Sequence, residues 1–245
     1  MIRAVIVDLD DTLLRRDKTV SAFTIETLRQ CRGKGIKLMV ATARGRSAKK
    51  LVPFDLFDGF VQMNGATGFA GDYIVYEKLI PPDVYIPFLQ EMDKAGIHTA
   101  AEIEGVHYAN FPVPHRKHEV VDFNMLMEAA EKAYVIVDAA EKADAVRRAL
   151  PADLWAHFTN DGYALLSSIE ATKKNAVAAV LAHWGIPAEE AAAFGDDTND
   201  VEMLAYCGTG VAMGNALDEV KAIANNVCMD CDDDGVAKWL ASHVL

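Results

Sequence analysis

Two aspartates, Asp8 and Asp10, have the residue type and spacing that could most directly carry chemistry in this chain. They follow residues 2–7, which are mostly apolar and β-branched and predict a buried parallel strand. Because side chains two apart on a strand share a face, we expect both carboxylates to project together where the strand ends. Two like charges at this spacing need a counter-charge, usually Mg²⁺. One carboxylate could then attack phosphorus while the other moves a proton.

Two further stretches carry polar groups at predicted element ends. Thr42 ends a second predicted strand, where its hydroxyl and nearby backbone N–H groups could hold phosphoryl oxygens, although it fits a helix N-cap equally well. Lys173 and Lys174 stand at the start of a predicted helix, where cations oppose the helix dipole. A lysine there could neutralise the aspartates and a phosphoryl group, and a solvated surface pair is the alternative.

A last acidic stretch, residues 195–200, again follows a predicted strand. Asp196 could complete a site of hard oxygen ligands for a metal ion. Asn199 could reach phosphate or cap the next helix, and Asp200 could hold a lysine. Taken alone, the stretch also fits an acidic turn.

The order of predicted elements indicates how these stretches are brought together. Strands at 4–10, 36–42 and 59–62 alternate with helices at 21–33 and 46–51, and the rhythm resumes with a helix at 172–184 and strands at 191–195 and 210–213. The intervening part is different: it predicts a hairpin of 97–103 and 106–111, helices near 120–130 and at 141–150, and strands at 133–137, 154–159 and 163–169. We therefore predict an α/β fold, a Rossmann-like doubly wound parallel sheet formed by residues 1–81 and 168–245, with an inserted α+β domain at 82–167.

Composition limits the class of protein. Of the 245 residues, 51% are hydrophobic, which is enough for a packed core, and no apolar run approaches the length of a membrane span. The net charge of −12 argues against binding to nucleic acid. We expect a cytoplasmic protein.

Cys228 and Cys231 have the spacing of a redox or half-zinc motif, but the flanking aspartates oppose thiolate chemistry, so we interpret the spacing as coincidental.

Together, the ordered motifs D-x-D-x-T, the strand-end threonine, the lysine and G-D-x-x-N-D resemble the haloacid dehalogenase superfamily, especially its Cof-type phosphatases, which carry a large α/β cap. The resemblance implies that Asp8 is a nucleophile that becomes an aspartyl phosphate, and that Asp10 first protonates the leaving alcohol and then deprotonates water. It further implies Mg²⁺ on the Asp8 carboxylate, the Asp10 backbone carbonyl and Asp196. It assigns binding of the phosphoryl group to the Thr42 side chain, the Ala43 amide, Lys173 and Asn199. It assigns orientation of the lysine to Asp200.

The predicted function is therefore a Mg²⁺-dependent phosphatase of small phosphorylated metabolites, such as sugar phosphates or phosphoglycolate, with the insert as a cap over the site. The alternatives are a phosphomutase with the same intermediate, a receiver-type phospho-accepting signalling module, and a non-catalytic binding protein on this fold. Asp10 and the insert argue against the receiver. The basic cluster at residues 115–118 either meets an anionic part of the substrate or forms a solvated loop.

Overall fold

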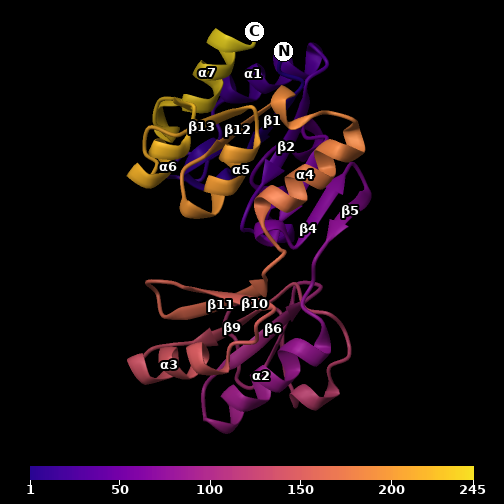
Figure 1. Ribbon diagram of the computed structural model, residues 1–245, viewed down its shortest axis with the longest axis vertical. Helices are drawn as coiled ribbons and strands as arrows, with labels where there is room; N and C mark the ends of the chain where they lie inside the picture. The colour runs from indigo at the N-terminus through magenta and orange to yellow at the C-terminus, as the bar shows by residue number, and fades with distance from the viewer. The chain divides into compact units, whose positions relative to one another are not determined.

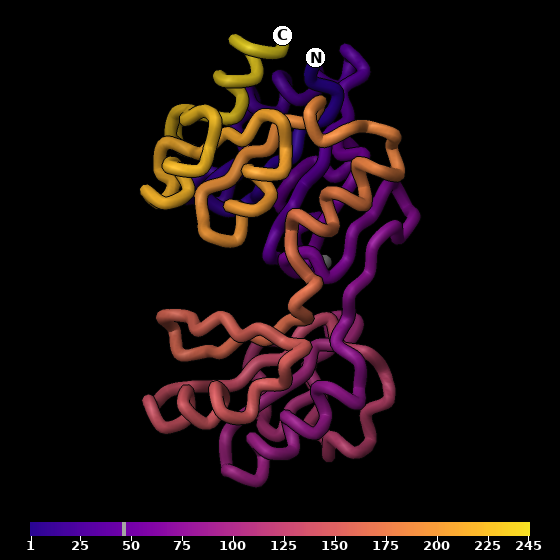
Figure 2. Tube along the Cα trace, in the orientation of Figure 1, coloured from indigo at the N-terminus to yellow at the C-terminus, as the bar shows by residue number. Residues whose placement is uncertain are grey.

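The structure is a computed structural model that describes residues 1–45 and 48–245 (Figure 2). The chain forms two compact units: unit 1 comprises Met1–Glu77 and Thr172–Leu245, and unit 2 comprises Lys78–Ala171 (Figure 1). The helix predicted at 46–51 begins outside the described residues. Among the described helices, none combines the length and apolar character that a membrane crossing requires.

Unit 1 is built on an eight-stranded sheet in the order β14-β13-β12-β1-β2-β3-β4-β5. Neighbouring strands from β14 to β3 are parallel, and β4 and β5 add an antiparallel hairpin at one edge. The strands are β1 (Ala4–Val7), β2 (Lys37–Ala41), β3 (Gly59–Gln62), β4 (Thr67–Ala70), β5 (Tyr73–Glu77), β12 (Ala191–Gly195), β13 (Thr209–Ala212) and β14 (Asn226–Val227). The predicted fold class is confirmed, with this antiparallel edge as an addition.

Helices cover both faces of this sheet, as a doubly wound fold requires. In Figure 1, α4 and α5 lie on the viewer's side of the sheet, and α1 lies on the far side, where it contacts α7. Thr172 caps α4 by accepting a hydrogen bond from the Asn175 amide, and Gly185 ends the helix in a left-handed conformation. The helices are α1 (Ala22–Gly33), α4 (Lys173–Trp184), α5 (Val201–Tyr206), α6 (Asp218–Ile223) and α7 (Gly235–His243).

The central strand β12 forms although three alanines give it a poor intrinsic preference for strand. All five of its residues are buried, and it pairs in parallel with β1 on one side and β13 on the other. Its small side chains suit a strand that is covered on both faces. The prediction of a strand at 191–195 is confirmed, because tertiary pairing outweighs propensity here.

Unit 2 contains a six-stranded sheet in the order β10-β11-β9-β6-β7-β8, antiparallel except for the last pair. Helices α2 (Pro82–Lys94) and α3 (Ala140–Ala149) pack on one face around a core that includes Phe88, Val135 and Val146. The strands are β6 (Thr99–Ile103), β7 (Val106–Ala109), β8 (His118–Val120), β9 (Lys132–Ile136), β10 (Leu154–Phe158) and β11 (Tyr163–Ser168).

One predicted element is wrong, and the limits of the compact units differ slightly from the predicted domain boundaries. The helix expected near 120–130 is instead the end of β8 and a single 3₁₀ turn, Phe123–Met125, because Asp122 caps that turn and Ala130 pairs as an isolated bridge with Ile80. The unit boundaries also lie about four residues from the predicted ones, at 77/78 and 171/172 rather than 81/82 and 167/168. The Ile80 bridge ties residues 78–81 to unit 2.

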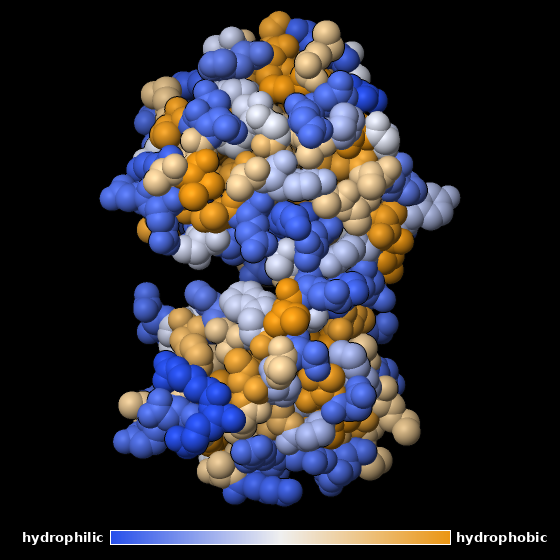
Figure 3. Space-filling view, in the orientation of Figure 1, coloured by the Kyte–Doolittle hydropathy of each residue, from blue (hydrophilic) through white to orange (hydrophobic). Residues whose placement is uncertain are grey.

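On the face drawn in Figure 3, hydrophilic side chains (blue) lie over both units, with hydrophobic patches (orange) between them. Exposed large hydrophobic residues include Tyr73, Met125 and Met127, and such residues are common on globular proteins.

Candidate active site

A buried ammonium bridges two carboxylates in unit 1. The Lys173 Nζ donates hydrogen bonds to Asp8 Oδ1 and to Asp200 Oδ1, both at 2.7 Å. These three side chains come from the end of β1, the first turn of α4 and the turn after β12, and all three are buried. Adjacent parallel strands β1 and β12 end at the same edge of the sheet, which is where open α/β sheets place ligands.

Asp200 also fixes the backbone of the turn in which it lies. Its Oδ2 accepts hydrogen bonds from the backbone amides of Asp196, at 3.0 Å, and Asp197, at 3.3 Å. Gly195 makes this possible, because a β-carbon there would lie 2.4 Å from Asp200 Cγ. The carboxylate therefore holds Lys173 with one oxygen and the strand-end turn with the other.

Burial changes the proton affinity of this cluster. It raises the pKa of the Asp8 carboxyl to about 8, although the neighbouring Lys173 acts in the opposite direction. Burial disfavours the Lys173 ammonium, but the Asp200 and Asp8 carboxylates outweigh it and hold the pKa of Lys173 above its ordinary value. The site is thus a low-dielectric environment rich in negative charge.

Asp196 adds a further carboxylate to the site. It is held by the Thr12 hydroxyl, which donates a hydrogen bond to Asp196 Oδ1 at 2.7 Å, and burial raises its pKa to about 6. Oxygens of Asp8, Asp196 and Asp200 all lie within 4.8 Å of one another. Clustered carboxylate oxygens are the ligands that Mg²⁺ prefers, so the donor set fits this ion.

The Asp10 carboxylate lies in a different ion pair. Arg44 binds it in bidentate fashion, with Nε to Oδ2 at 2.5 Å and Nη2 to Oδ1 at 2.7 Å, and Lys18 Nζ lies 3.0 Å from Oδ1. The hydrogen bond from Arg44 is the main reason that the pKa of Asp10 is lowered. Strand β1 ends at Val7, so the expectation that Asp8 and Asp10 share a strand face is wrong. The chain turns sharply at Asp11, whose φ is +57°.

The residues predicted to bind phosphate lie at neighbouring strand ends. Thr42 follows β2, is buried, and its hydroxyl accepts a hydrogen bond from the Arg44 amide at 3.1 Å. Ala43 is exposed. The Asn199 Nδ2 donates a hydrogen bond to Asn64 Oδ1 at 3.0 Å, and its second amide hydrogen has no acceptor among the described residues.

Of the two candidate lysines, the structure brings only Lys173 to the aspartates. The Lys174 Nζ instead contacts Asn175 Oδ1 at 3.2 Å and lies 5.9 Å from the centre of the Tyr206 ring. Residues at i and i+1 of a helix face different directions, so α4 can present only one of them to the site.

Sequence reasoning assigned no role to Thr12, Lys18 or Arg44. Thr12 had a usable signal, because it is the threonine of the D-x-D-x-T motif. Arg44 directly follows the strand-end stretch of Thr42, but nothing in the sequence pairs it with Asp10. Lys18 lies in a turn with φ +64°, so its approach to Asp10 depends on local backbone geometry.

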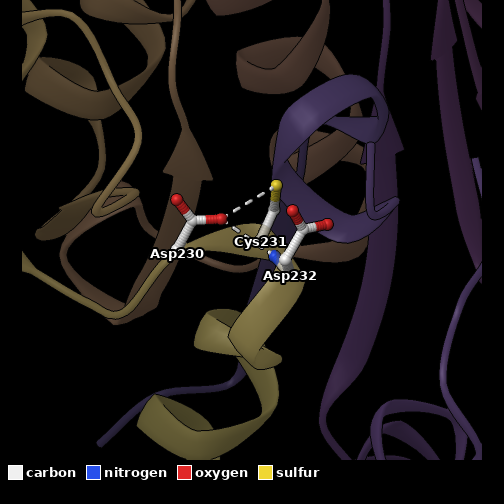
Figure 4. Close-up of side chains that lie close together, drawn as sticks. All are labelled: Asp230, Cys231 and Asp232. Atoms are coloured by element: carbon white, nitrogen blue, oxygen red, sulfur yellow. Dashed lines mark hydrogen bonds between the residues drawn. The ribbon is translucent and has the colours of Figure 1, made fainter. Parts of the chain in front are cut away.

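A second group of potential ligand atoms, from Asp230, Cys231 and Asp232, is structural in character (Figure 4). The Cys231 Sγ lies 3.5 Å from Asp230 Oδ1, and both aspartates pair with Arg16. Burial and the two carboxylates raise the pKa of the Cys231 thiol to about 12, and burial raises that of Cys228 to about 12. Neither thiol is poised as a thiolate, which agrees with a coincidental C-x-x-C spacing.

Comparisons with known proteins span nearly the whole chain. A model of haloacid dehalogenase-like hydrolases matches residues 5–240. The chain is 28% identical over 261 residues to the 5-amino-6-(5-phospho-D-ribitylamino)uracil phosphatase YitU of Bacillus subtilis (strain 168), covering 97% of this chain and 96% of that protein. It is similar to the solved sugar phosphatase BT4131 of subclass IIB, with a TM-score of 0.81, 26% identity and 98% of each chain covered. It also shares its fold with TM0651 from Thermotoga maritima, with a TM-score of 0.90 and 21% identity. The match covers 100% of this chain and 98% of that one.

Proposed function

The chain belongs to the haloacid dehalogenase-like hydrolase family, and we propose that it is a Mg²⁺-dependent phosphomonoester hydrolase of small phosphorylated metabolites that forms an aspartyl phosphate. The predictions of family, fold class and a phosphatase as the kind of enzyme are confirmed. The observation that best supports the finer proposal is the buried Asp8–Lys173–Asp200 bridge beside Asp196.

Asp8 is the proposed nucleophile. Lys173 donates a hydrogen bond to one carboxylate oxygen of Asp8, so the other oxygen can attack phosphorus. The second hydrogen bond, to Asp200, holds the lysine in place during the reaction. In the first step an Asp8 oxygen–phosphorus bond forms and the ester oxygen–phosphorus bond breaks. Lys173 then neutralises charge on both the attacking group and the phosphoryl group.

Asp10 is the proposed acid and base. It would give a proton to the leaving alkoxide, then take one from the water that attacks the aspartyl phosphate, which releases phosphate and regenerates Asp8. In the described conformation Arg44 and Lys18 hold Asp10 as a carboxylate. Its role therefore requires that the Asp10 side chain leave Arg44 when substrate is bound.

Asp8, Asp196 and the Asp10 backbone carbonyl are the proposed metal-binding groups. Bound Mg²⁺ would neutralise the carboxylates and polarise the phosphoryl oxygens. The Thr42 hydroxyl would need to exchange its backbone partner for a phosphoryl oxygen. The other proposed contacts to phosphate are the Ala43 amide, the Lys173 ammonium and the free Asn199 amide hydrogen.

Unit 2 is the proposed cap domain, which would select the substrate. The similar proteins support small organic phosphates as substrates, since one is named for a phosphorylated ribitylaminouracil and another for sugar phosphates. Sugar phosphates and phosphoglycolate-like esters therefore stay among the proposed substrate classes.

The proposal is tested with Asp8→Asn, which keeps the side-chain shape but removes the attacking charge. Hydrolysis of p-nitrophenyl phosphate with Mg²⁺ should fall by about a thousandfold or more while the circular dichroism spectrum is kept. Asp72→Asn, an exposed site in the β4–β5 turn, is the matched control and should retain wild-type turnover. Normal turnover by a folded Asp8→Asn protein would refute the mechanism. Phosphate transfer to an added sugar, without release of inorganic phosphate, would favour the phosphomutase.

A further inference from the structure

Unit 2 contains a pocket of about 700 Å³ that lies within this unit alone. It is on the sheet face opposite α2 and α3, as the alternation along β9 shows: Lys132, Tyr134 and Ile136 line the pocket, whereas Ala133 and Val135 belong to the helix-side core. The volume is in the range that accommodates a small organic ligand.

Aromatic rings form much of the pocket wall. Tyr134 and Tyr163 meet edge to face, with ring centres 6.0 Å apart, and His98 stacks on Phe111 with ring centres 4.6 Å apart and planes 12° apart. Flat apolar faces of this kind favour a planar aromatic guest, since aromatic pairs gain energy beyond simple area burial.

The polar lining is mainly cationic, although the chain as a whole is acidic. Of the described residues that line the pocket, Arg116 and Lys132 are positively charged and Asp161 alone is an acid. Lys132 already has a partner, since its Nζ lies 3.1 Å from Glu102 Oε2. The Arg116 guanidinium makes no ion pair with any described residue, so its planar donor fork is available for a carboxylate or similar group.

A buried histidine adds an unsatisfied polar group to the same wall. His107 is 5% exposed, and its Nδ1 has no hydrogen-bond partner among the described residues. Its Nε2 lies 3.8 Å from Glu102 Oε2, which is too far for a hydrogen bond. Buried polar atoms are usually paired, so an unpaired one at a pocket wall indicates a place where a ligand could be stabilised.

We propose that this pocket binds a planar aromatic or heteroaromatic molecule that carries an acidic group, with the ring against Tyr134 and Phe111 and the acid on Arg116. The molecule could be the non-phosphate part of the enzyme's own substrate, which rests on the proposed function, or a separate regulator. Both sources share one chemistry, and the experiments below distinguish them.

Binding is tested by calorimetry on the full-length protein with three planar acids: orotate, nicotinate and salicylate. At least one should bind more tightly than both uracil, which lacks an acid, and cyclohexanecarboxylate, which lacks a planar ring. Arg116→Gln should weaken that binding about tenfold, because a charge-assisted bidentate contact is lost. Lys117→Gln removes the same charge one residue away but outside the pocket lining, and it should leave the affinity unchanged.

Three results would overturn the proposal. One is that none of the planar acids binds the wild-type protein at millimolar concentration. Another is an equal loss of affinity in Arg116→Gln and Lys117→Gln, which would indicate general charge rather than a pocket contact. The third is equal binding of the planar acids and cyclohexanecarboxylate. Both substituted residues are exposed, so the variants should stay folded.

The source of the ligand is decided by kinetics with ribose 5-phosphate, uridine 5′-monophosphate and orotidine 5′-monophosphate. If the pocket takes part of the substrate, Arg116→Gln should raise KM for the orotidine ester about tenfold and not for ribose 5-phosphate, and free planar acids should compete. Calorimetric binding without competition would instead identify a separate regulator. Failure to hydrolyse any ester, including p-nitrophenyl phosphate, would refute the proposed function and leave the binding result standing.

Discussion

At the residue scale, the Lys173 ammonium is the group on which both buried carboxylates depend. Lys173→Met should leave Asp8 and Asp200 without their cation and lower the free energy of unfolding by about 3–5 kcal/mol, because breaking one side of a buried ion pair leaves uncompensated charge. Lys174→Met, at the neighbouring position, should change it by less than about 0.5 kcal/mol. Urea unfolding measures both, and equal effects would contradict the assigned contacts.

The Arg44–Asp10 pair predicts a shift in the pH dependence of activity. Arg44 lowers the pKa of Asp10 chiefly by hydrogen bonding, so Arg44→Gln should raise it. An acid that must be protonated to act loses activity above its pKa, so the falling limb of kcat/KM attributed to Asp10 should move to higher pH. Arg29→Gln, an exposed site in α1, should leave the profile in place. A shift to lower pH in Arg44→Gln would contradict this coupling.

Stabilisation by Mg²⁺ should depend on pH. Because burial raises the pKa of Asp196 to about 6 and of Asp8 to about 8, the metal-free folded protein keeps protons that the unfolded chain has lost. The metal-free stability should therefore fall as pH rises from about 4 through these values. Mg²⁺ needs the deprotonated carboxylates, so its increase in Tm should be small at about pH 5 and large at about pH 8. Asp196→Asn should reduce that increase, and an equal increase at both pH values would exclude this site.

The strand-end residues could be predicted because their positions follow from chain periodicity. Asp8 and Asp196 both follow apolar strand segments, and parallel strands bring such ends to one sheet edge. The partners of Asp10 could not be predicted. Arg44 and Lys18 reach it through local backbone conformations, and the hydrophobic periodicity of strands and helices carries no information about these.

At the scale of elements, Gly65 sets the approach of the β3–β4 connection to helix α4. Its φ is +102°, and a β-carbon there would lie 2.1 Å from the Thr172 carbonyl oxygen, at the start of the helix that carries Lys173. Gly65→Ala should therefore displace the first turn of α4 and lower both Tm and kcat. Gly71→Ala is the control, since its φ is +58° but no atom lies within 4 Å, so it should cost about 1–2 kcal/mol of stability and no activity. Equal effects of the two variants would contradict the role of the close approach.

Sequence patterns missed one hairpin and wrongly predicted one helix. The β4–β5 hairpin had a signal, because Gly71 and Asp72 separate two β-rich segments, yet its strands are short. The helix expected near 120–130 was predicted from an apolar spacing that a helix does not produce here. Its apolar residues Phe123, Leu126 and Ala130 pack into the core of unit 2 from a 3₁₀ turn, the residue that follows it and an isolated bridge.

At the scale of the whole molecule, each unit has its own hydrophobic core. One cluster lies entirely in unit 1, and two others lie entirely in unit 2. The insertion could be predicted because the alternation of strands and helices stops and then resumes. Its limits could not be placed to the residue, since residues 78–81 join unit 2 through one isolated bridge at Ile80.

Separate cores predict that unit 1 folds without unit 2. The cut ends lie near each other, because a β-carbon at Gly68 would lie 3.3 Å from Tyr76 Cβ, near the end of β5, and 3.5 Å from Ala176 Cβ, in the first turn of α4. Replacing residues 78–171 with a short glycine-serine linker should therefore give a protein that unfolds cooperatively in urea.

This deletion protein should also retain the chemistry and lose the selectivity. All the proposed nucleophile, acid–base, metal and phosphate groups lie in unit 1, so turnover of p-nitrophenyl phosphate should stay within about tenfold of the full-length protein. Its preference among larger phosphate esters should largely disappear, because the groups proposed to contact the leaving group lie in unit 2. A cooperatively folded deletion protein that keeps the full-length ranking of substrates would place selection in unit 1 and refute the assignment of unit 2 as the cap. A protein that fails to fold would show that the core of unit 1 is not sufficient by itself.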